Sequence, residues 1–260
     1  MLLDLSVFTP FDLLPWQWAI WICMGLFIGL TKTGFSGATL LIIPAVAMVF
    51  GAKQSTGINL PILILGDILA VIYYRRNAEW KHILRLLPWT VTGFAVAILV
   101  EKLIPVQSFK FLMGGCILTG LIVMVWNDFS RKEKQPPSSM WFSAFFGIAA
   151  GFATLIGNVS AGIMAVFLLS MRLPKISYVG TTAWYFLIAN FIKLPIQIFV
   201  WKNITMETFF FSMTNIPAVV AGTVLGIFLI KKVSEKVFRR IIMVLVLFST
   251  MLLFIDFSKF

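Results

Sequence analysis

The sequence has few acidic residues, one histidine and two cysteines. Its 260 residues include 10 Asp and Glu against 21 Lys and Arg, and only 12% of the chain is charged. The single histidine, His82, lies in a basic loop, which argues against a zinc site and against Ser-His catalysis. Neither Cys23 nor Cys116 has a Cys-x-x-Cys neighbour, so the sequence gives little evidence for a disulfide or a metal site. The sequence also lacks a Gly-x4-Gly-Lys-Ser/Thr motif, which excludes ATP hydrolysis by a P-loop. No cofactor or metal is therefore expected.

What the chain has in abundance is apolar surface. Hydrophobic residues make up 60% of it, and the mean hydropathy is +0.98. A soluble core of this size needs far less, so we predict an all-α, polytopic membrane protein of 8–10 transmembrane segments. The apolar segments are about 16–31, 38–51, 56–74, 86–100, 109–126, 141–156, 159–170, 178–200, 208–229 and 240–257. Two pairs of neighbouring segments are too short for ordinary spans. Each pair forms either two short spans or one re-entrant hairpin; the pairs are 16–31 with 38–51, and 141–156 with 159–170.

The net charge of +11 has two readings, a nucleic-acid surface or basic cytoplasmic loops. The loops account for it. With the N-terminus outside, 15 basic residues fall in inside loops and 5 in outside loops, if Lys32 counts as an inside loop charge. We therefore expect both termini outside a bacterial inner membrane, the lipid bilayer as environment and no nucleic-acid partner. Residues 1–15 contain no basic residue, unlike a signal peptide, so the first span is expected to be retained.

The chain divides into two similar halves, residues 1–130 and 141–260, joined by a cytoplasmic linker at 131–140. Gly25-x3-Gly29 matches Gly147-x3-Gly151 at an offset of 122, and Asp67 matches Asn190 at 123. Pro88-x4-Gly93 matches Pro217-x4-Gly222 at 129. If each half crosses the membrane an odd number of times, the halves form an inverted repeat, with a site near the midplane where broken or re-entrant helices meet. A parallel four-plus-four arrangement is the alternative.

Asp67 and Lys193 lie inside apolar segments and Lys32 lies in the break between two of them, and charge at membrane depth is costly and usually has a partner or a function. Asp67 either relays a proton or makes a structural pair with a lysine. Lys193 is either a buried cation or reaches the headgroups, and we favour the buried cation. Lys32 lies among hydroxyls and glycines, whose free N–H groups would suit an anion at a half-helix start. Two lysines against one aspartate favour a small anion with oxygen acceptors.

The candidate site is divided between binding and coupling. Asp67 is the candidate for proton coupling. The candidate substrate-binding residues are Lys32, Thr33, Gly34, Ser36, Gly37, Asn59, Asn158, Ser160, Thr181, Thr182, Asn190 and Lys193. The leading hypothesis is a secondary transporter that works by alternating access and is not an enzyme. The alternatives are an intramembrane lipid-modifying enzyme, which would need a nucleophile with a base or metal ligands at membrane depth, and a non-transporting membrane subunit.

The chain contains several short motifs in a characteristic order. They are the glycine-rich stretch at 25–37 followed by Pro44, the loop Gly51-Ala-Lys-Gln-Ser-Thr-Gly57, Gly66-Asp67, Tyr73-Tyr74-Arg75-Arg76, Gly180-Thr-Thr and Asn190-x-x-Lys193-Leu-Pro195. In these motifs the chain, over about 16–255, resembles the sulfite exporter TauE/SafE family of membrane permeases. The resemblance implies secondary transport of sulfite, sulfonates and related sulfur-containing anions. Many members look like Gly-x-Gly-Gly-Gly where this chain has Lys32-Thr-Gly34-Phe-Ser-Gly37, so the identity of the anion stays open.

Overall fold

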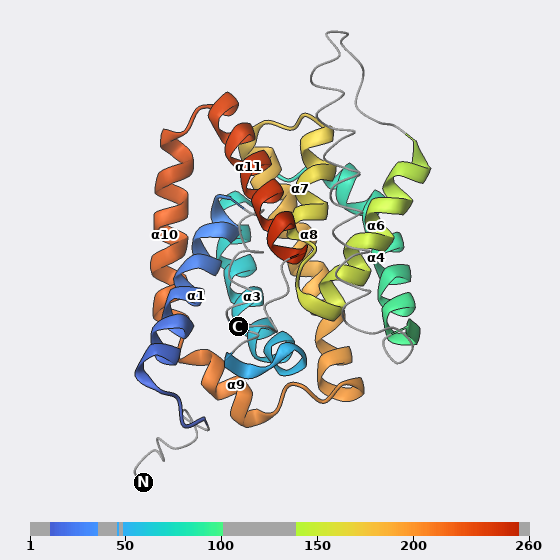
Figure 1. The fold of residues 1–260 in the computed structure, drawn as a ribbon. Coiled ribbons are helices and arrows are strands. Elements are labelled where there is room, and N and C mark those ends of the chain that lie inside the picture. The colour runs from blue at the N-terminus through green and yellow to red at the C-terminus, as the bar shows by residue number, and fades with distance from the viewer. Residues whose placement is uncertain (1–10, 36–45, 47–48, 101–138, 255–260) are drawn as a thin grey trace.

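The computed structural model describes residues 11–35, 46, 49–100 and 139–254, and every regular element in these ranges is a helix (Figure 1). The first half contains α1, α3 and α4, and the second half contains α6 to α11 with a π-helical segment, η3. Their bounds are α1 Pro15–Thr33, α3 Ala52–Tyr74, α4 Trp80–Val100, α6 Met140–Gly157, α7 Ala161–Ser170, α8 Lys175–Pro195, η3 Ile196–Val200, α9 Met206–Met213, α10 Ile216–Lys232 and α11 Glu235–Phe254.

Four helical stretches are long and apolar enough to cross a bilayer. They are Gln54–Tyr74, Trp80–Val100, Met140–Gly157 and Lys175–Val200, and the pair α9 and α10, bent by 48°, makes a fifth. The prediction of an all-helical, multi-pass membrane protein is therefore confirmed. The predicted total of 8–10 segments includes 38–51 and 109–126, which lie almost wholly or wholly outside the described residues, so that total stays a prediction.

Two helix pairs, each joining one half to the other, pack through glycines at backbone contact. In the pair α1 and α10, a Cβ added at Gly222 would lie 2.7 Å from the carbonyl carbon of Leu26. In the pair α4 and α6, a Cβ added at Gly93 would lie 2.9 Å from the backbone nitrogen of Phe152. Both distances are shorter than real Cβ contacts, so only glycine permits these approaches. The glycines of the repeat pattern thus serve close helix packing.

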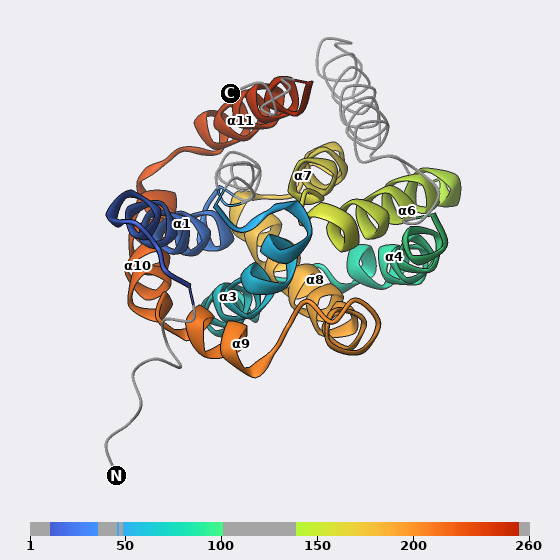
Figure 2. The same cartoon turned by 60° about the horizontal axis from the view of Figure 1, so that its bottom comes forward.

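Helices α3 and α8 cross in antiparallel directions at the centre of the molecule. The start of α3 meets the segment after α8 where Gln197 hydrogen-bonds Thr56, and the end of α3 meets the start of α8, where Gly180 lies against the carbonyl oxygen of Tyr74. Figure 2 shows α8 near the middle, with α1 and α10 on one side and α4 and α6 on the other. The side chains of α3 and α8 therefore meet deep in the protein.

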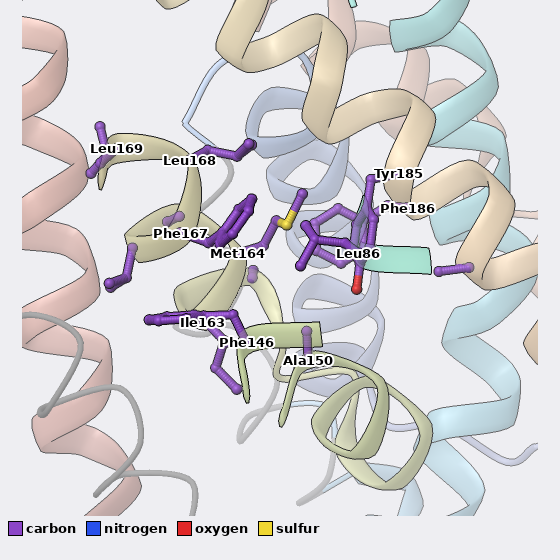
Figure 3. Close-up of a cluster of buried hydrophobic side chains, with 14 of the residues drawn as sticks. Leu86, Phe146, Ala150, Ile163, Met164, Phe167, Leu168, Leu169, Tyr185 and Phe186 are labelled. Atoms are coloured by element: carbon purple, nitrogen blue, oxygen red, sulfur yellow. The ribbon is translucent and has the colours of Figure 1, made fainter. Parts of the chain in front are cut away.

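The chain between α6 and α7 turns sharply inside the molecule. Asn158 ends α6 in a left-handed conformation, with φ 57°, and α7 begins at Ala161. With 10 residues, α7 is about 15 Å long, roughly half of a bilayer core. Its residues from Ala161 to Leu169 are all buried, and Figure 3 shows Ile163, Met164 and Phe167 in the apolar cluster that surrounds it.

One end of the bundle gathers most of the described basic residues. Lys231 lies over the ring of Tyr73 at 5.4 Å, and Lys175 donates a hydrogen bond of 3.0 Å to the carbonyl of Ile230, so the ends of α3 and α10 and the start of α8 share this face. We call it the basic face. Its residues are Arg75, Arg76, Lys81, Arg85, Arg172, Lys175, Lys231, Lys232, Lys236, Arg239 and Arg240. We call the opposite end, where α9 lies, the α9 face; Lys202 and Glu207 are there.

Candidate functional site

A buried ion pair joins α1 to α3. The ammonium of Lys32, in the last turn of α1, lies 2.7 Å from a carboxylate oxygen of Asp67. The Asp67 side chain has no exposed surface, and the ring of Phe186 covers the ammonium at 4.5 Å. Gly66 gives the lysine room, since a Cβ there would lie 3.1 Å from Lys32 Cγ. Lys32 is therefore a buried residue of the site, and counting it as a cytoplasmic loop charge was wrong.

Asn190 on α8 links this pair to the second half. Its Nδ2 donates a 2.7 Å hydrogen bond to the other carboxylate oxygen of Asp67, so the two residues that correspond in the predicted repeat are in direct contact. The Oδ1 of Asn190 is buried and has no partner among the described residues. A buried amide oxygen without a partner is uncommon and marks a position where a donor is missing.

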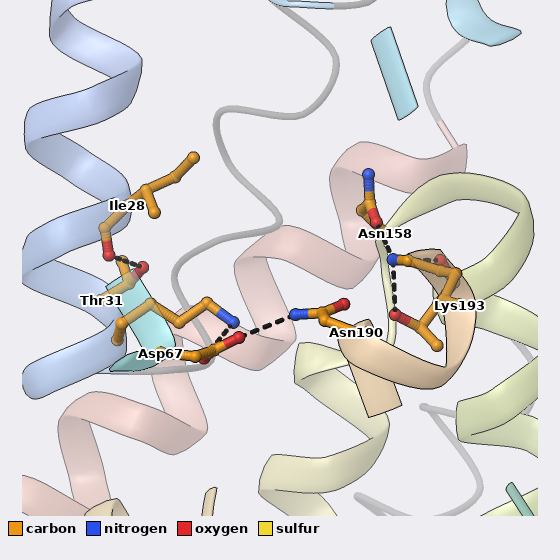
Figure 4. A network of polar contacts seen from close by, with 8 residues as sticks. Ile28, Thr31, Asp67, Asn158, Asn190 and Lys193 are labelled. Carbon is orange, nitrogen blue, oxygen red and sulfur yellow. Dashed lines mark hydrogen bonds and ion pairs between the residues drawn. The ribbon is translucent and has the colours of Figure 1, made fainter. Parts of the chain in front are cut away.

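Lys193 has the least compensated charge in the described part of the chain. Its side chain is 0% exposed, which excludes the alternative that it reaches the headgroups. The ammonium donates to Asn158 Oδ1 at 2.5 Å and to the carbonyl of Thr154 at 3.2 Å (Figure 4). Both partners are neutral groups at the C-terminal end of α6, where the helix dipole places roughly half a negative charge.

A small cavity lies between Lys32 and the two residues that hold Lys193, Thr154 and Asn158. Its volume is about 20 Å³, and Figure 4 shows Asn190 between Asp67 and Lys193. This space is enough for one water molecule and too small for an anion of four or more heavy atoms, so the site is closed around its interior. The formal charges of Lys32, Asp67 and Lys193 sum to one positive charge. The cavity is lined by Lys32, Leu63, Thr154, Asn158, Ala161, Phe186 and Asn190.

Four other predicted residues are buried at varying distances from this cavity. Ser160 lies two residues beyond Asn158 and precedes α7, and its buried hydroxyl has no partner within the described ranges. The Oδ1 of Asn59 is likewise buried without a described partner, but Asn59 lies eight residues before Asp67, about 12 Å along α3. Thr181 and Thr182 lie about 13 and 12 Å before Asn190 along α8, towards the basic face, where the Thr181 hydroxyl accepts from the backbone N–H of Glu79.

The glycine stretch at the end of α1 has a packing role where it is described. Gly25 and Gly29 lie inside α1 and do not interrupt it, because close contact with α10 compensates for their weak helix propensity. Gly34 caps α1 near Gly226, and the Thr33 hydroxyl donates to the carbonyls of Gly29 and Thr223. Ser36 and Gly37 lie outside the described residues.

Sequence reasoning missed four residues that line the cavity, Leu63, Thr154, Ala161 and Phe186, and two of these contact a lysine. Thr154 offers its carbonyl to Lys193, and Phe186 covers Lys32. The repeat contained a signal for the first, because Thr154 follows Lys32 by the same offset of 122 that relates the glycine pairs. The sequence contained no signal for Phe186. The chain has 26 phenylalanines, and one of them in an apolar helix cannot be distinguished from an ordinary core residue.

Residues 21–253 match the family profile described as sulfite exporter TauE/SafE. The chain belongs to this family. The match covers nearly the whole sequence and confirms the predicted resemblance, and with it a membrane protein of a transporter family. No curated protein and no solved structure matches the chain significantly. The TauE/SafE assignment therefore rests on the sequence profile.

Proposed function

We propose that this TauE/SafE protein is a secondary transporter of small anions and that the cavity lined by Lys32 and by the Lys193 partners Thr154 and Asn158 is its substrate site. The observation that carries the proposal is Lys193, a fully buried ammonium whose described partners are all neutral. A membrane protein rarely retains an incompletely balanced charge at such depth without a function. Sulfite and organosulfonates are the favoured substrates, because the family is one of sulfite exporters and their oxygens would accept hydrogen bonds from the two ammonium groups.

Alternating access is the proposed mechanism, with the two halves as an inverted repeat. Three contacts support this architecture. The corresponding helices α3 and α8 run antiparallel, the corresponding residues Asp67 and Asn190 touch, and the packing of α1 on α10 has its counterpart in α6 on α4. A two-fold axis in the membrane plane would relate all three. The turn at Asn158 would allow α7 to move against α6 as the closed cavity opens.

We further infer that the basic face is cytoplasmic, which puts the N-terminus outside the cell membrane in keeping with the positive-inside rule. Asp67 is the proposed coupling residue. It holds Lys32 in the closed state, and its protonation would release the ammonium to the anion. A proton and an anion would then enter the site together, and their charges would cancel.

Flux through purified protein in liposomes tests the proposal. Vesicles are loaded with labelled sulfite, methanesulfonate, sulfate or a neutral control such as glycerol, with and without a pH gradient. We expect saturable movement of at least one sulfur anion and none of glycerol. The absence of flux for every anion under both conditions, from protein that remains monodisperse, would refute the transport function.

A further inference from the structure

The α9 face carries a polar vestibule. It is a cavity of about 410 Å³, far larger than the closed one beside Lys32. Its walls combine one cation, Lys202, and one anion, Glu207, with neutral polar side chains including Gln54 and Asn203. A hydrated anion of a few heavy atoms fits such a volume.

A line of neutral polar contacts connects this vestibule to Lys193. Asn203, in the vestibule wall, donates to Gln197 Oε1 at 3.0 Å, and Gln197 Nε2 donates to the Thr56 hydroxyl at 3.3 Å. The backbone carbonyl of Thr56 accepts from Asn158 Nδ2 at 3.3 Å, and Asn158 is the residue that holds the Lys193 ammonium. Hydrogen bonds between neutral groups exchange for hydrogen bonds with water at small net cost.

Local backbone geometry turns Gln197 inward. Pro195 ends α8 and cannot donate a backbone hydrogen bond, and the chain continues as the π-helical η3. Gln197 is the buried residue of that segment. Single π-turns of this kind occur often at functional sites.

The opposite end of the site is sealed by aromatic rings. Tyr74, which follows Asp67 by seven residues as Gln197 follows Asn190, is 1% exposed and donates to the carbonyl of Thr33 at 3.0 Å. Beside it Tyr178 packs against Phe238, with ring centroids 5.3 Å apart. Opening this end would bring large apolar surfaces into contact with water. At the α9 end, separating the contacts among Thr56, Gln197 and Asn203 would expose polar groups, and it would not require the neighbouring aromatic cluster around Phe211 to open.

From this asymmetry we propose that Thr56, Gln197 and Asn203 form the gate through which the anion passes between the vestibule and the site. The gate opens towards the α9 face, and the aromatic seal keeps the basic face closed while it does so. This inference rests on the proposed transport function for its cargo, but the accessibility of the gate can be measured without transport.

The test uses single cysteines and a membrane-impermeant methanethiosulfonate that carries a sulfonate group. Cys23 and Cys116 are first replaced by serine. Gln197→Cys and Thr56→Cys, which replaces the hydroxyl by a thiol and removes one methyl group, are the test variants. Gln54→Cys, in the vestibule wall, and Ser234→Cys, between α10 and α11, are controls for the two faces. Reagent is added to right-side-out and inside-out vesicles, and modification is followed by mass.

We expect Gln197→Cys and Thr56→Cys to react at least tenfold faster from the side that labels Gln54→Cys than from the side that labels Ser234→Cys. Faster reaction from the Ser234 side, or no reaction of either variant from either side while Gln54→Cys labels fully, overturns the gate. If the wild-type protein moves no anion while the single-cysteine variants show the expected labelling pattern, the proposed function is refuted and the gate is supported. A protein that transports anions but labels from the Ser234 side refutes the gate alone.

Discussion

The substitution Lys193→Met tests whether Lys193 binds the anion or only caps the C-terminal end of α6. Methionine is unbranched and of similar length, so it fills the same space without the charge. For a monovalent anion about 4 Å from the ammonium, the attraction at an effective dielectric constant of about 20 is ~4 kcal/mol. If the C-terminal end of α6 cancels half of the lysine charge, ~2 kcal/mol is left. At 1.4 kcal/mol per factor of ten, the dissociation constant should rise by between about 30-fold and about 1,000-fold.

The same substitution should change stability little. It removes the cost of burying an ammonium, several kcal/mol, along with hydrogen bonds worth about 1.5–3 kcal/mol. Titration of sulfite and methanesulfonate into detergent-purified protein measures affinity, and thermal unfolding of the same samples measures stability. The matched control is Lys236→Met, an exposed lysine on α11. Affinity within threefold of wild type, combined with a lowered unfolding temperature, would show that Lys193 caps α6 and does not bind the anion.

Three further experiments probe the Lys32–Asp67 pair and the glycine packing. Lys32→Met leaves the buried Asp67 carboxylate without its cation and should destabilise the protein by about 3–5 kcal/mol, while adding Asp67→Asn should restore most of the unfolding temperature. Asp67→Asn alone should abolish the response of flux to an imposed pH gradient, and an unchanged response would exclude Asp67 from coupling. Gly222→Ala should lower the unfolding temperature because its Cβ meets the Leu26 backbone, whereas Gly157→Ala, whose Cβ would meet only the side chain of Val159 at 3.3 Å, should be tolerated; equal effects would contradict the packing role.

The sequence was most informative where chemistry and repeat symmetry agreed. A buried acid, two buried lysines and a matched asparagine are rare in lipid, so Asp67, Asn190, Lys32 and Lys193 stood out, and the structure brings Asp67 and Asn190 into contact. The hydroxyls were harder to place. Thr181 is polar and near Asn190 in sequence, but nine residues of helix carry it to the basic face.

Glycine was ambiguous for a different reason. It weakens a helix by about 1 kcal/mol whether it ends the helix or lets another helix approach, so one sequence does not distinguish the two roles. At Gly25 and Gly29 the tertiary contact with α10 decides in favour of packing. The vestibule was also beyond sequence reasoning, because Gln54 and Asn203 are far apart in the chain and come together only when α3 and α8 cross.

The glycine contacts join helices from different halves of the sequence. In the proposed alternating access, the two halves would therefore not move against each other as separate rigid bodies. Gly29 and Gly222 fasten α1 to α10, and Gly93 and Gly151 fasten α4 to α6, so each tightly packed pair takes one helix from each half. A half expressed alone would expose the glycine-lined surface that normally packs against a helix of the other half. Two separately translated halves should therefore fold only when both are present. A protein cut at the linker should remain a single complex.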